Sequence, residues 1–122
     1  HEQARALIVG GGGLVSLAGT NSVKELELRE SEGDEEARAA LDLLCYTVAK
    51  EIGAMAAALS GEVDAIILTG GIAYSRRVTD AIASRCRFVA PVTVYAGENE
   101  LQALALNALR VLRGETQPKI YV

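Results

Sequence analysis

The chain has 122 residues, half of them apolar, and a net charge of −4 at pH 7. A chain of this length forms one domain. The acidic balance and the lack of basic clusters interleaved with aromatic residues exclude a typical nucleic-acid-binding protein. With one Phe and no Trp, a core must be built from Ala, Leu, Ile and Val. The apolar excess either fills that core or forms a face that expects another domain or subunit.

A run of four glycines occupies residues 10–13, after the apolar residues 6–9. A phosphate-binding loop of the Walker type would continue with Gly-Lys and a hydroxyl residue. This run continues with Leu14 and Val15 instead. We therefore interpret it as a structural turn or a helix C-terminus.

Two helices are predicted next. Good N-cap residues at 19–22 precede a charged helix that ends near Gly33. Asp34 is a strong N-cap for a second helix, with two glutamates in its first turn, where the helix dipole favours negative charge. Apolar residues recur along this helix at helical spacing, with Met55 as core filling, and Gly61 stands at the expected C′ position. Small residues on more than one side indicate that this helix is sandwiched between neighbours.

The rest of the chain predicts a strand, a helix, a strand and a helix. The β-branched run at 63–69 indicates a strand buried on both faces, as in parallel sheets. A helix follows over about 75–87. A second strand is predicted over 88–95, with Pro91 at its start or at an edge, and an amphipathic helix over about 99–113. This order is that of a βαβ unit, and the fold class is α/β.

Several kinds of chemistry have no support in the sequence. Cys45 and Cys86 lie in apolar helical stretches without partners at metal-ligand spacing, and we interpret them as small buried hydrophobes in a reducing cytosol. The apolar stretch 37–59 contains charged residues and predicts a core helix, not a membrane span. The one His is His1, so no His-dependent catalytic triad is expected. We predict a cytoplasmic chain with no catalytic or metal-binding residues.

The strongest candidate site follows the first predicted strand. Ligands bind open α/β sheets at the carboxyl ends of strands, and here residues 69–75 lead into a helix that opens near Ser75. Two glycines let a flat or charged ligand approach the backbone, and the helix N-terminus offers N–H groups to an anion. Arg76 and Arg77 stand where the dipole disfavours cations. They either pair with acids such as Asp80 or face an anionic ligand.

The loop and helix start at residues 19–25 form a second candidate, because polar loop and cap groups can hydrogen-bond a ligand. Most such groups are only helix caps. The two segments together suggest a pocket for a nucleotide, without catalytic groups of its own.

At this point several segments together resemble the butyrate kinases, which are grouped with the acetate kinases. The segments are residues 12–15, 19–21, 49–56, 63–73, 88–92, 103–106 and 109–115. The resemblance implies the C-terminal ribonuclease-H-like lobe of the superfamily of acetate and sugar kinases, heat-shock ATPases and actin, whose two lobes close over ATP. It covers only about the last third of such an enzyme. Residues 1–122 would thus be a single partial, truncated nucleotide-binding lobe, with the N-terminal lobe absent.

The resemblance also implies where adenosine binds. In the family, the glycine pair after the strand lies against the adenosine. The loop after Gly19 borders the adenine in acetate kinases through an acidic residue and an Arg, and this sequence departs from that pattern. The residues implied for nucleotide binding are Gly70, Gly71, Ile72 and Ser75 after the strand, and Asn21, Ser22 and Lys24 in the loop.

The implied parent reaction transfers the γ-phosphoryl group of ATP to butyrate, giving ADP and butanoyl phosphate. Mg²⁺ would be held mainly by the phosphates and the other lobe. The parent would be a phosphotransferase with a carboxyl group as acceptor, and we expect the 122-residue chain alone to be inactive. The alternative is a non-catalytic adenosine-binding or dimerisation module, since the C-terminal lobe supplies the subunit interface in acetate kinases. An exposed face between lobes predicts a homo-oligomer.

Overall fold

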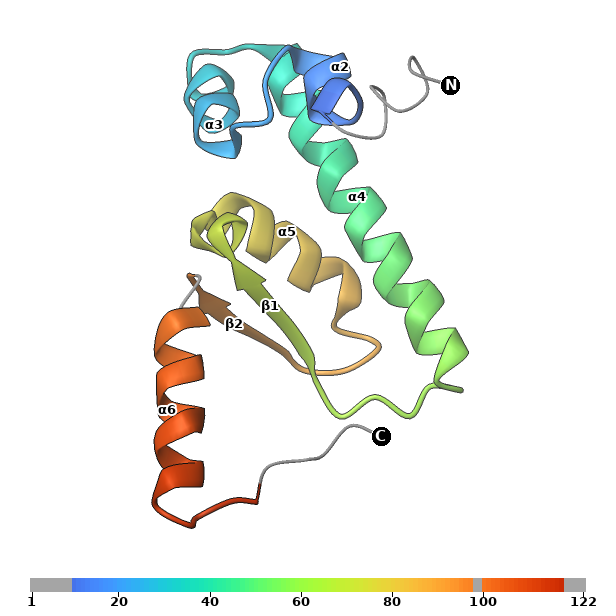
Figure 1. The fold of residues 1–122 in the computed structure, drawn as a ribbon. Coiled ribbons are helices and arrows are strands. Elements are labelled where there is room, and N and C mark those ends of the chain that lie inside the picture. The colour runs from blue at the N-terminus through green and yellow to red at the C-terminus, as the bar shows by residue number, and fades with distance from the viewer. Residues whose placement is uncertain (1–9, 98–99, 118–122) are drawn as a thin grey trace, which may run out of the picture.

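The computed structural model describes residues 10–97 and 100–117. Its helices are α2 (Leu14–Ala18), α3 (Val23–Ser31), α4 (Glu35–Ala58), α5 (Arg76–Cys86) and α6 (Glu100–Leu112), and a 3₁₀ helix, η2, spans Gly71–Tyr74. The strands are β1 (Ile66–Gly70) and β2 (Val92–Ala96). In Figure 1, α2 and α3 lie around the first turns of the long helix α4, and α5 and the strands lie farther along it. The glycine run turns the chain into α2, a short helix that the sequence pattern did not predict.

The strands form a two-stranded parallel sheet, and α5 lies between them in the chain. Ile66 is paired with Val92 and Gly70 with Ala96. This is the predicted βαβ unit, and the α/β class is confirmed. Both strands begin later than the predicted residues 63 and 88. Pro91 directly precedes β2, and its carbonyl oxygen accepts a hydrogen bond from the Ile66 amide at 2.9 Å, so the proline lies at the strand start as predicted.

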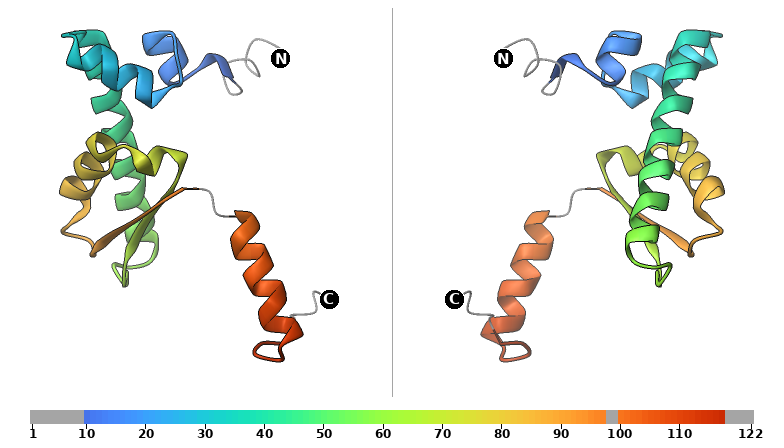
Figure 2. Two further views of the ribbon diagram at one scale, coloured as in Figure 1. Left: turned by 90° about the vertical axis from the view of Figure 1, so that its left-hand side faces the viewer. Right: turned by 90° about the vertical axis from the view of Figure 1, so that its right-hand side faces the viewer.

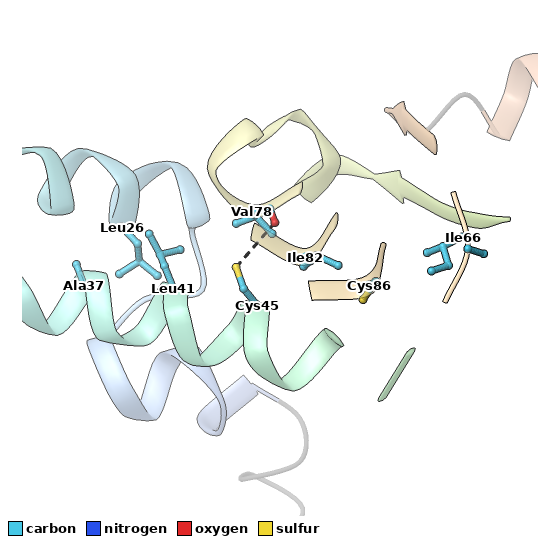
Figure 3. Close-up of a cluster of buried hydrophobic side chains, with 9 residues drawn as sticks. Leu26, Ala37, Leu41, Cys45, Ile66, Val78, Ile82 and Cys86 are labelled. Carbon is cyan, nitrogen blue, oxygen red and sulfur yellow. Dashed lines mark hydrogen bonds between the residues drawn. The ribbon is translucent and has the colours of Figure 1, made fainter. Parts of the chain in front are cut away.

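The core lies where α3, α4 and α5 meet and extends to one face of the sheet (Figure 3). The largest fully buried side chains are Leu26, Leu41, Val78, Cys45 and Cys86. Both cysteines are free thiols, and burial raises the pKa of each. Their interpretation as small buried hydrophobes is confirmed.

The ends of α4 show how capping sets its length. The Asp34 carboxylate accepts hydrogen bonds from the amides of Glu36 and Ala37, at 2.9 and 3.1 Å, so the predicted N-cap is confirmed. At the other end, Ser60 takes the left-handed C′ position, with φ 56°. The prediction of Gly61 at C′ is therefore wrong by one residue. The helix ends one residue earlier than that prediction requires, and Gly61 occupies C″, where it closes the Schellman motif.

The prediction that the first strand, β1, is buried on both faces is wrong. Ile66 is 8 % exposed, whereas Ile67, on the opposite face, is 62 % exposed. Met55, predicted as core filling, is 59 % exposed. The physical reason is similar in both places: α3 and α5 pack on α4, and α5 also packs on the sheet, so no described element covers Met55 or Ile67. The described residues thus leave one sheet face and the C-terminal part of α4 open.

Helix α6 stands apart from the other elements (Figure 2). It makes no extensive contact with another described element, although its leucines have amphipathic spacing. The predicted last helix is confirmed, but its apolar side packs against none of the described core. Among the described residues, no helix is both long enough and apolar enough to span a membrane.

Candidate functional site

The turn after β1 has the geometry that the candidate site requires. Gly70 has φ 86° and ψ −177°, a backbone conformation that only glycine adopts readily. A Cβ added there would meet no atom within 4 Å, so the backbone angles explain the glycine. The 3₁₀ helix η2 then leads to Ser75, whose hydroxyl oxygen accepts a hydrogen bond from the Val78 amide at 3.0 Å and caps α5. The turn therefore presents Gly71 and Ile72 at the carboxyl end of the strand.

The start of α3 is fixed by a local hydrogen-bond network. The Ser22 hydroxyl oxygen accepts from the Glu25 amide at 3.3 Å. The Thr20 hydroxyl donates to the Glu25 carboxylate at 2.9 Å and accepts from the Ser22 amide at 3.2 Å. Only half of a capping box is formed directly, because the Thr20 hydroxyl stands between the Ser22 amide and the Glu25 carboxylate. Ser22 is thus a helix cap, and its hydroxyl oxygen is engaged within the protein.

A pocket of about 260 Å³ lies between α3 and the turn after β1. It is lined by Val23, Lys24 and Glu27 from α3 and by Gly71, Ile72, Tyr74 and Ser75 from the turn. Four of the predicted nucleotide-binding residues, Lys24, Gly71, Ile72 and Ser75, are therefore brought together. They come from the two segments that the sequence singled out separately.

The other three predicted residues lie beside the pocket and do not line it. Gly70 ends β1, Ser22 caps α3, and Asn21 is exposed in the loop before that cap. Sequence reasoning did not assign the other three lining residues, Val23, Glu27 and Tyr74, to nucleotide binding. Glu27 had a usable signal, because residues three apart on a helix share a face and Lys24 was already a candidate.

Glu27 and Ser75 are directly bonded across the pocket. The Ser75 hydroxyl donates to Glu27 Oε1 at 2.6 Å. Ser75 is 8 % exposed, and Glu27 is half-buried. A carboxylate beside the first turn of α5 lies where the helix dipole favours negative charge. Ser75 and Glu27 thus lie at the start of α5, and Ser75 caps the Val78 amide, while anion binding by this helix start stays a prediction.

Arg77 joins the three core helices. Its guanidinium donates to both oxygens of Glu30 on α3, at 3.1 to 3.2 Å, and to Asp42 on α4 at 2.8 Å. These hydrogen bonds, Glu30 foremost, raise the pKa of Arg77. The predicted alternative of pairing with acids is confirmed for Arg77, but the acids are Glu30 and Asp42 on two other helices, not the neighbouring Asp80. The network holds α3 against α5, and these helices carry the two sides of the pocket.

Comparison with known proteins agrees with the sequence resemblance. Residues 2–99 match the acetokinase family. Probable butyrate kinase 2 of Caldanaerobacter subterraneus subsp. tengcongensis is 48 % identical to this chain over 120 residues, which are 98 % of the chain and 34 % of that protein. The chain thus spans about one third of the length of this curated relative. The predicted resemblance to butyrate kinases is confirmed, and the chain belongs to the acetokinase family.

Proposed function

We propose that the pocket between α3 and the turn after β1 binds the adenosine part of ATP. The main observation in support of this proposal is that Lys24, Gly71, Ile72 and Ser75 line one pocket. These residues come from the two segments for which the family resemblance implies nucleotide binding. Membership of the acetokinase family supports ATP as the phosphoryl donor.

The lining suits a nucleoside better than a whole nucleotide. Val23, Ile72 and Tyr74 provide apolar surface for a flat base, and Gly71 allows close approach to the backbone. The pocket volume of about 260 Å³ is below the roughly 300–1,000 Å³ of sites for drug-sized ligands. The phosphates would extend beyond this pocket.

The parent reaction in this proposal is ATP plus butanoate giving ADP and butanoyl phosphate, in the cytoplasm, where ATP is available. It rests on the family and on the relative's name. The ribonuclease-H-like lobe is part of the same proposal, since a two-stranded parallel sheet is common to many α/β folds.

The residues that the structure describes form no metal site of their own, so in this proposal magnesium is held mainly by the phosphates and the other lobe. The described residues contain no group of three or more His, Cys, Asp or Glu side chains placed to hold a metal ion. Phosphoryl transfer needs metal and cationic groups around the reacting phosphate. We therefore assign no chemical step to these residues. Our proposal is that the 122-residue chain binds the nucleoside but does not turn over alone.

Dimerisation is the second candidate function, and the exposed apolar surface favours it. On α6, Leu104 is 66 % and Leu112 is 82 % exposed. Near the end of α4, Met55 and Leu59 line an apolar groove of about 380 Å³. A dimer in light scattering would support this function, and a monomer at all concentrations would contradict it.

The nucleotide proposal is tested by titrating MgATP into the folded protein by calorimetry, with MgGTP as the comparison. Saturable MgATP binding is expected, and its absence from a folded protein would contradict the proposal. The catalytic proposal is tested by trapping acyl phosphate with hydroxylamine in the presence of butyrate. No butyrate-dependent product is expected from this chain alone, so formation of the hydroxamate would refute its inactivity.

A further inference from the structure

The side chain of Tyr74 covers Gly97, the glycine that follows β2. A Cβ added to Gly97 would lie 2.7 Å from the Tyr74 hydroxyl oxygen and 3.5 Å from the ring carbon that bears it. Non-bonded atoms do not approach so closely, so no side chain fits at Gly97 while the ring keeps its place. Gly97 also has φ 113°, which favours glycine. The end of the phenol ring is therefore in direct contact with the backbone of Gly97.

The turn that carries Tyr74 also holds Gly97 by its backbone. The Gly97 amide donates to the Gly70 carbonyl oxygen at 3.2 Å, and the two glycines form a bridge beyond the parallel ladder. A distance of 3.2 Å is at the long end of the range for such hydrogen bonds. The segment from Gly70 to Tyr74 thus contacts Gly97 in two ways, by a long hydrogen bond and by the ring.

Gly97 precedes helix α6, which begins at Glu100. Helix α6 stands apart from the other elements (Figure 2) and has no extensive contact with another described element. Its Leu104 and Leu112 are 66 % and 82 % exposed. Among the described residues, the contacts at Gly97 are therefore the last before α6 that can fix the direction of this helix and the place of its apolar face.

Tyr74 combines a fixed backbone with a side chain that is free to turn. The Ser75 amide, next in the chain, donates to the Ile72 carbonyl oxygen at 3.0 Å, and the Ser75 hydroxyl oxygen caps α5. Tyr74 itself is 71 % exposed, and it lines the pocket of about 260 Å³ between α3 and the turn. Exposed side chains change rotamer within nanoseconds. The pocket and the solvent give the ring other positions, away from Gly97.

We propose that Tyr74 and Gly97 form a clasp that sets the direction of α6. The helix keeps one direction while the ring covers Gly97, and it takes others when the ring turns away. Glycine allows many backbone directions, and the ring removes those that bring the chain into it. The long hydrogen bond to Gly70 does not fix both dihedral angles of Gly97 by itself. The clasp is thus a conformational device that controls where the apolar face of α6 is presented.

The test measures the distance between α6 and α4 by double electron–electron resonance, with nitroxide labels on Leu104→Cys and Lys50→Cys of the whole protein. Both positions are exposed, whereas Cys45 and Cys86 are buried, with raised pKa values, and react slowly. The clasped protein is expected to give one distance. Tyr74→Ala should broaden the distribution, or shift its mean by more than the width measured with Tyr74 in place. An unchanged distribution would overturn the proposal.

Gly97→Ala separates the clasp from the general effect of replacing a glycine. With Tyr74 present, the new Cβ displaces the ring or the chain, so the distance between the labels should shift. In the Tyr74→Ala background the clash is absent, and Gly97→Ala should shift the distance less. Tyr74→Ala replaces an exposed side chain, so this variant decides the question by itself if Gly97→Ala does not fold.

Gly114→Ala is the matched control, because Gly114 lies beyond the other end of α6 with φ 73° and an added Cβ there meets no atom within 4 Å. It should leave the distance between the labels unchanged. Equal shifts from Gly97→Ala and Gly114→Ala would contradict the clasp. So would a shift from Gly97→Ala that is the same with and without Tyr74.

Discussion

Two parts of the chain have amphipathic helices, and only one of them buries its apolar side. In the cluster of α3, α4 and α5, Leu26 and Leu41 are completely buried. In α6, leucines at similar helical spacing include Leu104 and Leu112, which are 66 % and 82 % exposed. The spacing of apolar residues therefore predicts that a helix has an apolar face, but it does not predict which surface covers that face. The comparison separates a packed core from a helix face that no described residue covers.

The largest loss of stability is expected from a substitution of a leucine in the buried cluster. Leu41→Ala should lower the free energy of unfolding by about 3 kcal/mol, because it removes buried methyl groups and leaves a cavity. Leu104→Ala makes the same chemical change on an exposed side chain and should cost less than about 0.5 kcal/mol. Urea unfolding followed by circular dichroism measures both. Equal losses would show that α6 is packed as tightly as the core.

A smaller effect is expected from the ion pairs that hold the cluster together. Arg77→Met should cost about 1 kcal/mol, because it leaves Glu30 and Asp42 without the partner that joins three helices. Arg76→Met removes the same charge from the neighbouring exposed residue, for which no ion pair with a described residue is found. Its unfolding midpoint in urea should match the wild type. The network account is wrong if the two variants unfold alike.

The smallest expected change depends on pH. The Ala37 amide and the Arg29 guanidinium hold the pKa of Asp34 below its ordinary value of 3.8. A lowered folded-state pKa means that the ionised carboxylate stabilises the fold above that value, and that this stabilisation is lost as the pH falls through the folded-state pKa. Asn keeps an oxygen for capping but has no charge.

Asp34→Asn should therefore have a lower Tm than the wild type at about pH 6, and the same Tm once the pH is well below 3.8. Thermal melts by circular dichroism at about pH 6 and about pH 2 give the two differences. A Tm difference that is the same at both pH values would show that the charge of Asp34 contributes nothing.

The local features of this chain could be predicted from the sequence. Asp34 and Ser75 are capping residues with short-range signals, and both cap the predicted helices. The parallel βαβ unit followed from the order of apolar runs. Contacts between distant segments gave no such signal. The Glu27 bond to Ser75 spans 48 residues, and the partners of Arg77 lie on two other helices, so sequence neighbours such as Asp80 were a poor guide.

The candidate site was only partly predicted, because some of its residues are brought together by contacts between distant segments. Lys24 and Ile72 were expected near a nucleotide and do line one pocket. Sequence alone did not show that the carboxylate of Glu27 would occupy the start of α5, since that requires the relative placement of α3 and α5. Exposure of Ile67 was equally hidden, because a β-branched strand reads the same whether one or both of its faces are covered.

The central claim is that the pocket beside Gly71 binds the nucleotide, and the affinity of a Gly71→Val variant for MgATP tests it most directly. The added side chain would occupy the pocket that Gly71 lines. Gly53→Val is the matched control, because a Cβ at Gly53 meets no atom within 4 Å and Gly53 is outside this pocket. Calorimetry should show wild-type affinity for the control and about tenfold or greater weakening for Gly71→Val. Equal affinity in the two folded variants would contradict the assignment of this pocket to ATP.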